Sequence, residues 1–225
     1  MRNSPAQMAA MDFVRAASAA FSRQARLILL VLGGIAVAGC SIIPEAAADP
    51  TRYYVLDGPE AATLPAIAAG GTLAIRSIEL PAYLRNTKSM VVRVGENEVR
   101  YEDYSRWAEP LDAGIQRIVR ERLVNLLGAA SVVSFPLNAG ETRRWDLRVQ
   151  VLRCEGSAPR GGSPGMLFVA GFQILDATDG RQVARDQVIV NDLDWDGRDF
   201  GALARQLSAA VTRFADDVAR NVPGR

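Results

Sequence analysis

The chain of 225 residues contains no histidine, and its single lysine is Lys88. The absence of histidine excludes Ser-His-Asp triads and imidazole metal sites, and it removes the commonest general base. A serine–lysine mechanism would have to use Lys88, whose surroundings, NTKSM, are typical of an exposed connection. We therefore expect a protein that is not an enzyme and that holds no metal and no free cofactor.

Cysteine is scarce as well, because only Cys40 and Cys154 are present. Cys154 lies in a strand-like run without a neighbouring lysine or histidine, which favours a buried small hydrophobic role over a reactive thiol.

The net charge is +1, of which the first 39 residues hold +3, so the rest of the chain is near −2. A slightly acidic domain gives no electrostatic footprint for nucleic acid.

The apolar run at residues 27–40, LILLVLGGIAVAGC, is too short for a bilayer span, which takes roughly 20 residues. It follows several arginines and ends in small residues, which is the layout of a secretory signal. Val-Ala-Gly-Cys resembles the bacterial lipobox, which implies a diacylglyceryl group and an acyl chain, such as palmitate, on Cys40 and cleavage before it. Ser41 then implies sorting to the outer membrane. A plain secretory signal or a membrane anchor, with Cys40 incidental, is the alternative.

Three segments follow from this interpretation: a signal peptide at 1–39, a lipidated tether at 40–51 and a single domain at 52–222. The tether is rich in alanine and proline and has no hydrophobic period, as a flexible connection requires. The mature length of about 185 residues suits one domain with one core.

Alternation and turn signals predict eight strands, at 53–56, 72–80, 90–94, 98–101, 130–135, 145–152, 166–175 and 183–190. Hairpins are expected around 95–97 and around Asp179-Gly180. Helical periodicity predicts two amphipathic helices, at 110–127 with Pro110 as the first helical residue, and at 199–220. The run 145–152 alternates most regularly, which indicates one wet face and antiparallel neighbours. The order predicts an α+β, two-layer domain with a largely antiparallel sheet and both helices packed on it.

Two groups of residues have a functional and a structural interpretation. Asp192, Asp194, Asp196 and Gly197 have the spacing of the first half of a calcium loop, but Leu203 stands where the bidentate glutamate belongs. An acidic turn before a helix explains the same residues, because a helix N-terminus favours carboxylates. The second group consists of basic residues that have acidic residues between them in the sequence, which indicates a solvated face. They are Arg143, Arg144, Arg148 and Arg153.

The residues before the first long helix form a second candidate site. Arg106, Trp107 and Glu109 could act as a ligand clamp, but a tryptophan beside a helix start is more often a core anchor. The segment 81–85, here called the contact segment, is too short and too broken to have a core of its own. Tyrosine and arginine are enriched at interface hot spots. The segment either contacts a neighbouring subunit or a partner protein, or packs on its own sheet. The candidate partner-contact residues are Pro81, Tyr83, Leu84, Arg85, Trp107, Glu109 and Pro110.

Several short motifs in order resemble one family. They are YYVL at 53–56, LPAYL at 80–84, RWAEPL at 106–111, and the Asp179-Gly180 hairpin followed by a final amphipathic helix. With a lipobox in front, they resemble the PqiC-like, ABC-type transport auxiliary lipoproteins over nearly all of the mature domain. The sequence departs from that family at Cys154, where an aromatic residue is common, and at the glycine-rich loop that follows.

The resemblance implies a non-catalytic, lipid-anchored protein on the periplasmic face of the outer membrane, in an MCE-type lipid transport system. It implies as partners a periplasmic MCE-domain protein and, through it, an inner-membrane permease with or without an ATPase. It also implies a ring-like homo-oligomer. Two alternatives stay open: a periplasmic hydrolase, and a stand-alone structural lipoprotein that binds peptidoglycan or assists outer-membrane assembly.

Overall fold

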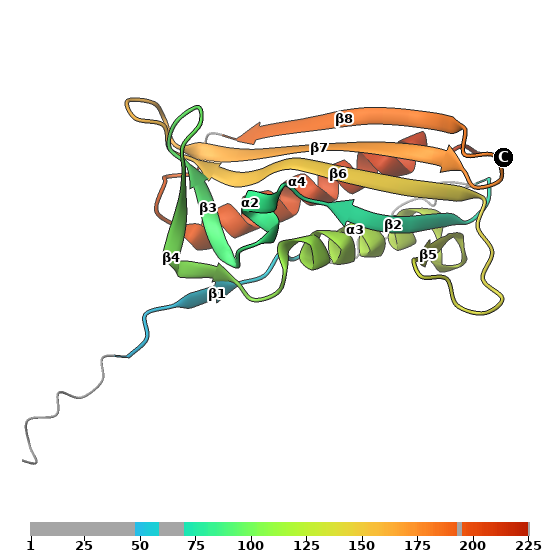
Figure 1. Ribbon diagram of the computed structural model, residues 1–225, viewed down its shortest axis with the longest axis horizontal. Coiled ribbons are helices and arrows are strands. Elements are labelled where there is room, and N and C mark those ends of the chain that lie inside the picture. The colour runs from blue at the N-terminus through green and yellow to red at the C-terminus, as the bar shows by residue number, and fades with distance from the viewer. Residues whose placement is uncertain (1–47, 59–69, 193–194, 225) are drawn as a thin grey trace, which may run out of the picture. The chain divides into compact units, whose positions relative to one another are not determined.

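The computed structural model describes residues 48–58, 70–192 and 195–224. The chain divides into two units, Met1–Asp49 and Pro50–Arg225, and every described helix and strand lies in the second (Figure 1). The strands are β1 Arg52–Tyr54, β2 Leu73–Glu79, β3 Ser89–Arg93, β4 Val99–Trp107, β5 Val132–Ser134, β6 Trp145–Ser157, β7 Gly165–Asp176 and β8 Gln182–Asp192. The helices are α2 Ala82–Arg85, α3 Leu111–Leu127, the 3₁₀ helix η2 Ala129–Ser131 and α4 Phe200–Asn221.

The eight strands form one sheet around β6. On one side, β7 pairs with β6 antiparallel along its whole length, and β8 pairs antiparallel with β7. The other side of β6 is shared, because β2 pairs in parallel with its first part and β3 pairs in parallel with its last residues. Strand β5 extends the sheet beyond β2, while β4 and then β1 extend it beyond β3.

This sheet is mixed, so the expectation of a largely antiparallel sheet was wrong. The pairs β1–β4, β2–β5, β2–β6 and β3–β6 are parallel. The chain between β2 and β5 includes α3, and such a crossover brings the next strand back in the same direction. Alternation along β6 did predict its wet face, since Arg148 and Gln150 are exposed. The alternation of polar and apolar residues carries no information on the direction of the neighbouring strands.

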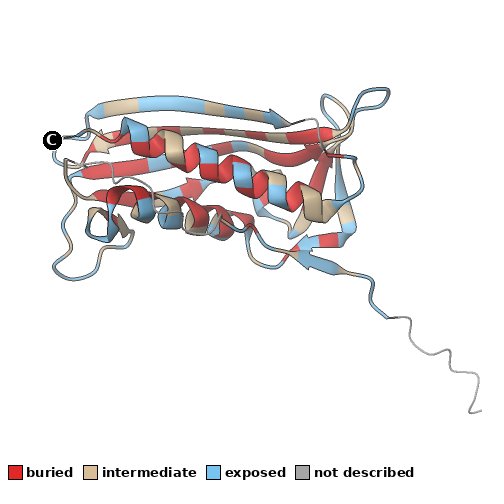
Figure 2. Ribbon diagram, turned by 180° about the vertical axis from the view of Figure 1, so that it is seen from behind, coloured by how far each residue is buried: buried red, intermediate tan, exposed pale blue. Residues whose placement is uncertain are grey.

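Helices α3 and α4 cover one face of the sheet, as Figure 2 shows from behind. The predicted stripe of α4 is buried, and it consists of Leu203, Leu207, Val211, Phe214 and Val218. The Phe214 ring meets Phe168 and Phe172 of β7 edge to face, with centroid distances of 6.0 and 5.9 Å. Both predicted amphipathic helices are confirmed. Among the described residues, no helix combines the length and the apolar character needed to cross a membrane.

The ends of these elements follow local signals with small shifts. Pro110 is the N-cap of α3 and not its first helical residue, and Gly128 ends that helix with φ +89°. The Asp199 carboxylate caps α4 by accepting a hydrogen bond from the Ala202 N–H at 3.0 Å. Gly180 has φ +74° in the β7–β8 hairpin, a conformation that favours glycine. The predicted hairpins at 95–97 and 179–180 are both present.

Strand β6 is longer than its sequence pattern indicated. The alternation stops at residue 152 because the pairing with β7 shifts register between Val151 and Arg153. Beyond this bulge Cys154, Glu155 and Gly156 are all buried, and the strand continues to Ser157. The expected strand at 130–135 is reduced to β5, preceded by the turn of η2.

Candidate ligand groove and contact segment

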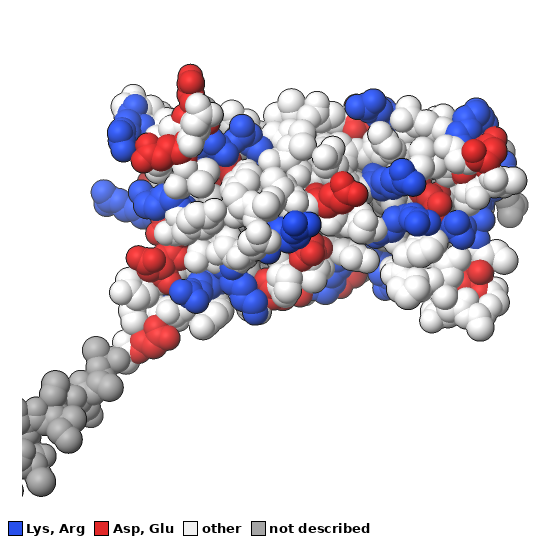
Figure 3. Space-filling view, in the orientation of Figure 1, with Lys and Arg blue, Asp and Glu red and all other residues white. Residues whose placement is uncertain are grey.

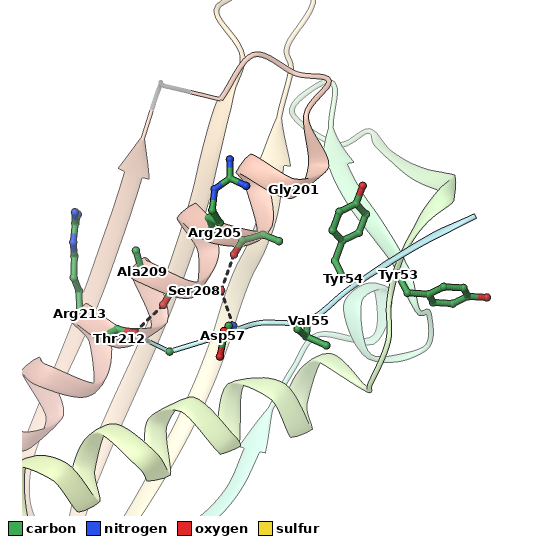
Figure 4. A pocket seen from close by; sticks show the side chains of 12 residues that line it. Tyr53, Tyr54, Val55, Asp57, Gly201, Arg205, Ser208, Ala209, Thr212 and Arg213 are labelled. Atoms are coloured by element: carbon green, nitrogen blue, oxygen red, sulfur yellow. Dashed lines mark hydrogen bonds between the residues drawn. The ribbon is translucent and has the colours of Figure 1, made fainter. Parts of the chain in front are cut away.

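A hollow of about 740 Å³ lies between the chain at residues 53–58 and helix α4 (Figure 4). On one wall, the large side chains of Tyr53 and Val55 are 62% and 51% exposed. The helix wall includes several small residues, among them Gly201, Ala204 and Ala209. Small side chains on the helix leave space that larger ones would fill, so the hollow is an open groove along α4. This groove is called the α4 groove below.

The two hydroxyl groups that α4 contributes to the groove, those of Ser208 and Thr212, are occupied by local hydrogen bonds. The Ser208 hydroxyl donates to the Ala204 carbonyl at 2.7 Å and accepts from the Asp57 N–H at 3.0 Å. The Thr212 hydroxyl donates to the Ser208 carbonyl at 3.0 Å. Such bonds to the preceding helical turn satisfy a hydroxyl within the helix. The wall is therefore largely apolar in character, and Ser208 also fixes the chain at residue 57 on α4.

Two arginines lie at the edge of the α4 groove. Arg205 is 3.9 Å from the Asp199 carboxylate, while Arg213 forms no ion pair with any residue that the structure describes. Arg213 lies eight positions after Arg205, which corresponds to about 12 Å along the helix axis. An apolar wall with basic groups at its edge suits an apolar chain that carries an acidic group. The groove is therefore suited to binding.

The contact segment is attached to the sheet by a buried carboxylate. The Tyr83 hydroxyl donates to Glu155 Oε2 at 2.8 Å, and Glu155 Oε1 accepts from Arg93 Nε at 2.6 Å and from Arg153 Nη1 at 3.1 Å. Glu155 is 1% exposed. Partial burial, followed by the hydrogen bond and the negative charge of Glu155, raises the pKa of Tyr83 to about 12. Sequence reasoning missed Glu155, although an acid within a strand-like run was a visible signal.

The other residues of the contact segment divide between core and surface. Leu84 is buried in the hydrophobic core, Pro81 and Tyr83 are half-buried, and Arg85 is exposed. A hollow of about 450 Å³ beside the segment is lined in part by Tyr83 and Tyr101. Packing on its own sheet therefore uses Leu84 and the Tyr83 hydroxyl, while Arg85 stays accessible to a partner.

The residues before α3 do not converge as a clamp. Trp107 is 4% exposed and belongs to the core, whereas Arg106 donates to the Asp103 carbonyl at 3.2 Å. Glu109 accepts a hydrogen bond of 2.7 Å from Arg117, which also donates to the Leu56 carbonyl. Exposed Pro110 follows. Of the predicted contact residues in this group, exposed Pro110 and half-buried Glu109 reach the surface.

The acidic turn before α4 acts as a helix entry in the part that is described. The Asp196 carboxylate accepts hydrogen bonds of 2.8 Å from the N–H groups of Arg198 and Asp199, and these bonds lower the pKa of Asp196. Asp194 and the side chain of Asp192 lie outside the described residues. Within residues 48–58, 70–192 and 195–224, no three His, Cys, Asp or Glu side chains form a group that could hold a metal ion.

Three of the four predicted surface arginines are in ion pairs. Arg143 pairs with Asp146 at 2.7 Å, Arg144 with Asp176 at 3.0 Å, and Arg153 with Glu155. Arg148 has no such partner among the described residues. Cys154 is buried as expected, and burial raises the pKa of its thiol.

Comparison with known proteins gives a family and a fold. A protein-family model described as the ABC-type transport auxiliary lipoprotein component matches residues 54–219. The crystal structure of protein XCC0632 from Xanthomonas campestris is 17% identical, with a TM-score of 0.59, and the match covers 75% of this chain and 90% of that one. A crystal structure of an uncharacterized protein is 17% identical, also with a TM-score of 0.59, over 77% and 99% of the two chains. At these identities the likeness shows the fold alone. No curated protein sequence matches this chain.

Proposed function

Because the chain belongs to the family of ABC-type transport auxiliary lipoprotein components, we propose that it is a non-catalytic component of an MCE-type lipid transport system. The observation that carries the proposal is the α4 groove. Its volume of about 740 Å³ is in the range of small-molecule sites, roughly 300–1,000 Å³. Exposed apolar side chains gathered in a hollow mark binding surfaces. The groove supports binding of one acyl chain, with Arg205 or Arg213 near its acidic head group.

Anchoring and partners complete the proposal. A lipid on Cys40 holds the protein at the periplasmic face of the outer membrane. The exposed parts of the contact segment, together with Glu109 and Pro110, contact a periplasmic MCE-domain protein or a second copy of this chain in a homo-oligomeric ring. Contact with an inner-membrane permease and an ATPase is indirect, through the MCE-domain protein. The accessible Arg85 beside a rigidly held Tyr83 supports this assignment.

The partner assignment is tested with a photo-crosslinking residue at Tyr83 in cells. Adducts with the MCE-domain protein or with a second copy are expected. The same residue at Arg181, in the exposed turn between β7 and β8, is the control and is expected to give neither adduct. A folded, lipidated protein without adducts at position 83 would show that the contact segment serves only its own fold.

The α4 groove is tested by filling it. Ala209 lines the groove and is exposed, so Ala209→Trp should block it without disturbing the core. Ala113→Trp, at an exposed position on α3, is the matched control. Lipid that co-purifies with the protein, measured by native mass spectrometry, should be lost in Ala209→Trp and kept in Ala113→Trp. Equal lipid content in both variants would contradict the assignment of the groove.

The anchor is tested separately. Cys40→Ser should leave the domain folded, with an unchanged melting temperature, but without acyl groups, since Cys40 precedes the unit that carries the core. Mass spectrometry of the wild-type protein should show acyl groups on Cys40. A mature wild-type chain without them would overturn the lipoprotein assignment.

A further inference from the structure

The sheet face opposite α3 and α4 is the face that Figure 3 shows. It carries a polar hollow of about 310 Å³, and Gly171 is among the residues that line it. Strand register places the side chains around it in rows. One row runs Gln150, Gly171 and Gln187 across β6, β7 and β8. The next row is Arg148, Gln173 and Arg185. Because Gly171 has no side chain, the surface is recessed between Gln150 and Gln187. Arg148 and Arg185 lie in the next row.

The fold does not require glycine at position 171. Its row lies outside the register shifts of both neighbouring pairs, and Gly171 is not among the glycines with positive φ. Outside residues 170–172, the nearest atom to a Cβ there would be the Asp186 carbonyl oxygen at 3.6 Å, which is ordinary contact. Glycine weakens the interior of a strand, and it often marks a place where a ligand approaches closely.

The two arginines beside the hollow have no ion-pair partner in the part of the chain that the structure describes. Arg148 and Arg185 are exposed, and neither forms a salt bridge with a residue in the described ranges. They lie two strands apart, so their Cα atoms are separated by about 10 Å. Both long side chains can reach the space over Gln173. Guanidinium groups bind phosphate with two parallel hydrogen bonds, which makes such a pair suited to a phosphate group.

The remaining groups define the rest of the ligand. Glu79 lines the hollow from β2, beside Gln150, and its carboxylate accepts hydrogen bonds from a hydroxyl or an amine. Asp186 also borders the hollow, but alternation along β8 directs its side chain to the other face of the sheet. Two guanidinium groups therefore face one carboxylate. This balance favours an oxyanion that also carries a hydrogen-bond donor.

We propose that the hollow over Gly171 is a binding site for a phosphate ester. The phosphate lies between Arg148 and Arg185, the glutamine amides donate to its oxygens, and the hydroxyl- or amine-bearing part points toward Glu79. The head group of a phospholipid and a small soluble ester share this chemistry. The site lies on the opposite side of the sheet from the α4 groove and does not depend on the function proposed above.

The test uses the full-length protein in non-ionic detergent micelles, with binding measured by isothermal titration calorimetry. The soluble probe is sn-glycerol 3-phosphate, with glycerol as its uncharged control. The lipid probe is phosphatidylglycerol added to the micelles, with diacylglycerol as its uncharged control. Binding of the soluble ester identifies a site for free phosphate esters, and binding of phosphatidylglycerol alone identifies a head-group site. Either result supports the proposal.

Variants decide whether binding occurs at this hollow. Arg148→Gln and Arg185→Gln should each weaken binding by about tenfold, because each removes a charge-assisted hydrogen-bond donor. Gly171→Val should abolish binding while the melting temperature stays within a few degrees, and Gly171→Ala serves if valine disturbs the strand. Arg181→Gln, at an exposed arginine of the adjacent turn, should bind as the wild type does. The proposal is overturned if neither phosphate probe binds, or if the arginine variants bind as tightly as wild type.

Discussion

The Tyr83 hydroxyl donates a hydrogen bond of 2.8 Å to the Glu155 carboxylate across 72 residues of sequence. Glu155 Oε1 accepts hydrogen bonds from Arg93 and Arg153, so the two arginines compensate the buried charge and both carboxylate oxygens have a hydrogen-bond donor. The contact segment contains only one short helix, α2, which could not hold a fixed shape alone. The link to Glu155 therefore fixes the position of Tyr83, and with it the surface that we assign to a partner.

The same link predicts an unusual titration. The pKa of Tyr83 is raised to about 12, whereas an unfolded tyrosine titrates near pH 10. The neutral phenol is therefore favoured by folding, and this stabilisation is complete below about pH 10 and lost as pH rises through 12. The difference in ultraviolet absorbance between wild type and Tyr83→Phe should titrate near pH 12.

A matched variant identifies the cause of that shift. Glu155→Gln removes the negative charge beside the phenol, so the Tyr83 titration should move to lower pH. Burial, the largest cause, would remain and would keep the pKa of Tyr83 raised in part. A Tyr83 titration near pH 10 in the wild-type protein would contradict the buried contact.

Trp107 is predicted to be a stability residue. Since only 4% of its surface is exposed, Trp107→Ala should lower the free energy of unfolding by about 3–5 kcal/mol. Tyr104, three residues earlier on β4, is 59% exposed, and Tyr104→Ala should change stability by no more than about 0.5 kcal/mol. Urea denaturation of both variants measures the difference. Unchanged stability with lost partner binding would instead make Trp107 a contact residue.

The sequence predicted those elements that depend on neighbouring residues. Helices α3 and α4 and the β7–β8 hairpin are defined by periodicity, caps and turn glycines such as Gly128 and Gly180. The pairing of β2 and β3 with the same side of β6 could not be predicted in this way. Tertiary packing and the α3 crossover decide which strands share one side of a strand.

The candidate sites were harder to predict for the same reason. The walls of the α4 groove come from residues 53–58 and 201–213, which no local pattern connects. Glu155 was not predicted because the alternation ends at the bulge after Val151, before this residue. Gly171 was visible as a glycine in the middle of an expected strand, but its meaning depends on the arginines of two other strands.

Gly156 is predicted to be required by packing. A Cβ atom at this position would lie 2.5 Å from Trp195 Cζ3 and 3.2 Å from Leu203 Cδ2, and both side chains are fully buried. Gly156→Ala should therefore cost about 1–3 kcal/mol of unfolding free energy. Gly171→Ala is the control within the same sheet and should be neutral or slightly stabilising, since its Cβ has room. Equal melting temperatures for the two variants would contradict the close approach of Trp195.

Cys154 is predicted to be inert in the folded protein. It is 2% exposed, and burial, with a smaller contribution from the charge of Glu155, raises the pKa of its thiol. Because the thiolate is the reactive form, Ellman's reagent at pH 8 should modify Cys154 only after denaturant is added. Cys154→Ser is the control, because it should not show the additional reaction with Ellman's reagent when denaturant is added.

The raised pKa of Cys154 also fixes the sign of a pH effect. An unfolded thiol ionises near pH 8.5 while the folded one stays neutral, so the contribution to stability is complete below about pH 8.5 and declines above it. The free energy of unfolding of the wild type should therefore fall between pH 8.5 and 10 more steeply than that of Cys154→Ser. Urea denaturation across this range measures the two slopes. Equal slopes, or rapid modification of the native protein, would show that the thiol is accessible to solvent.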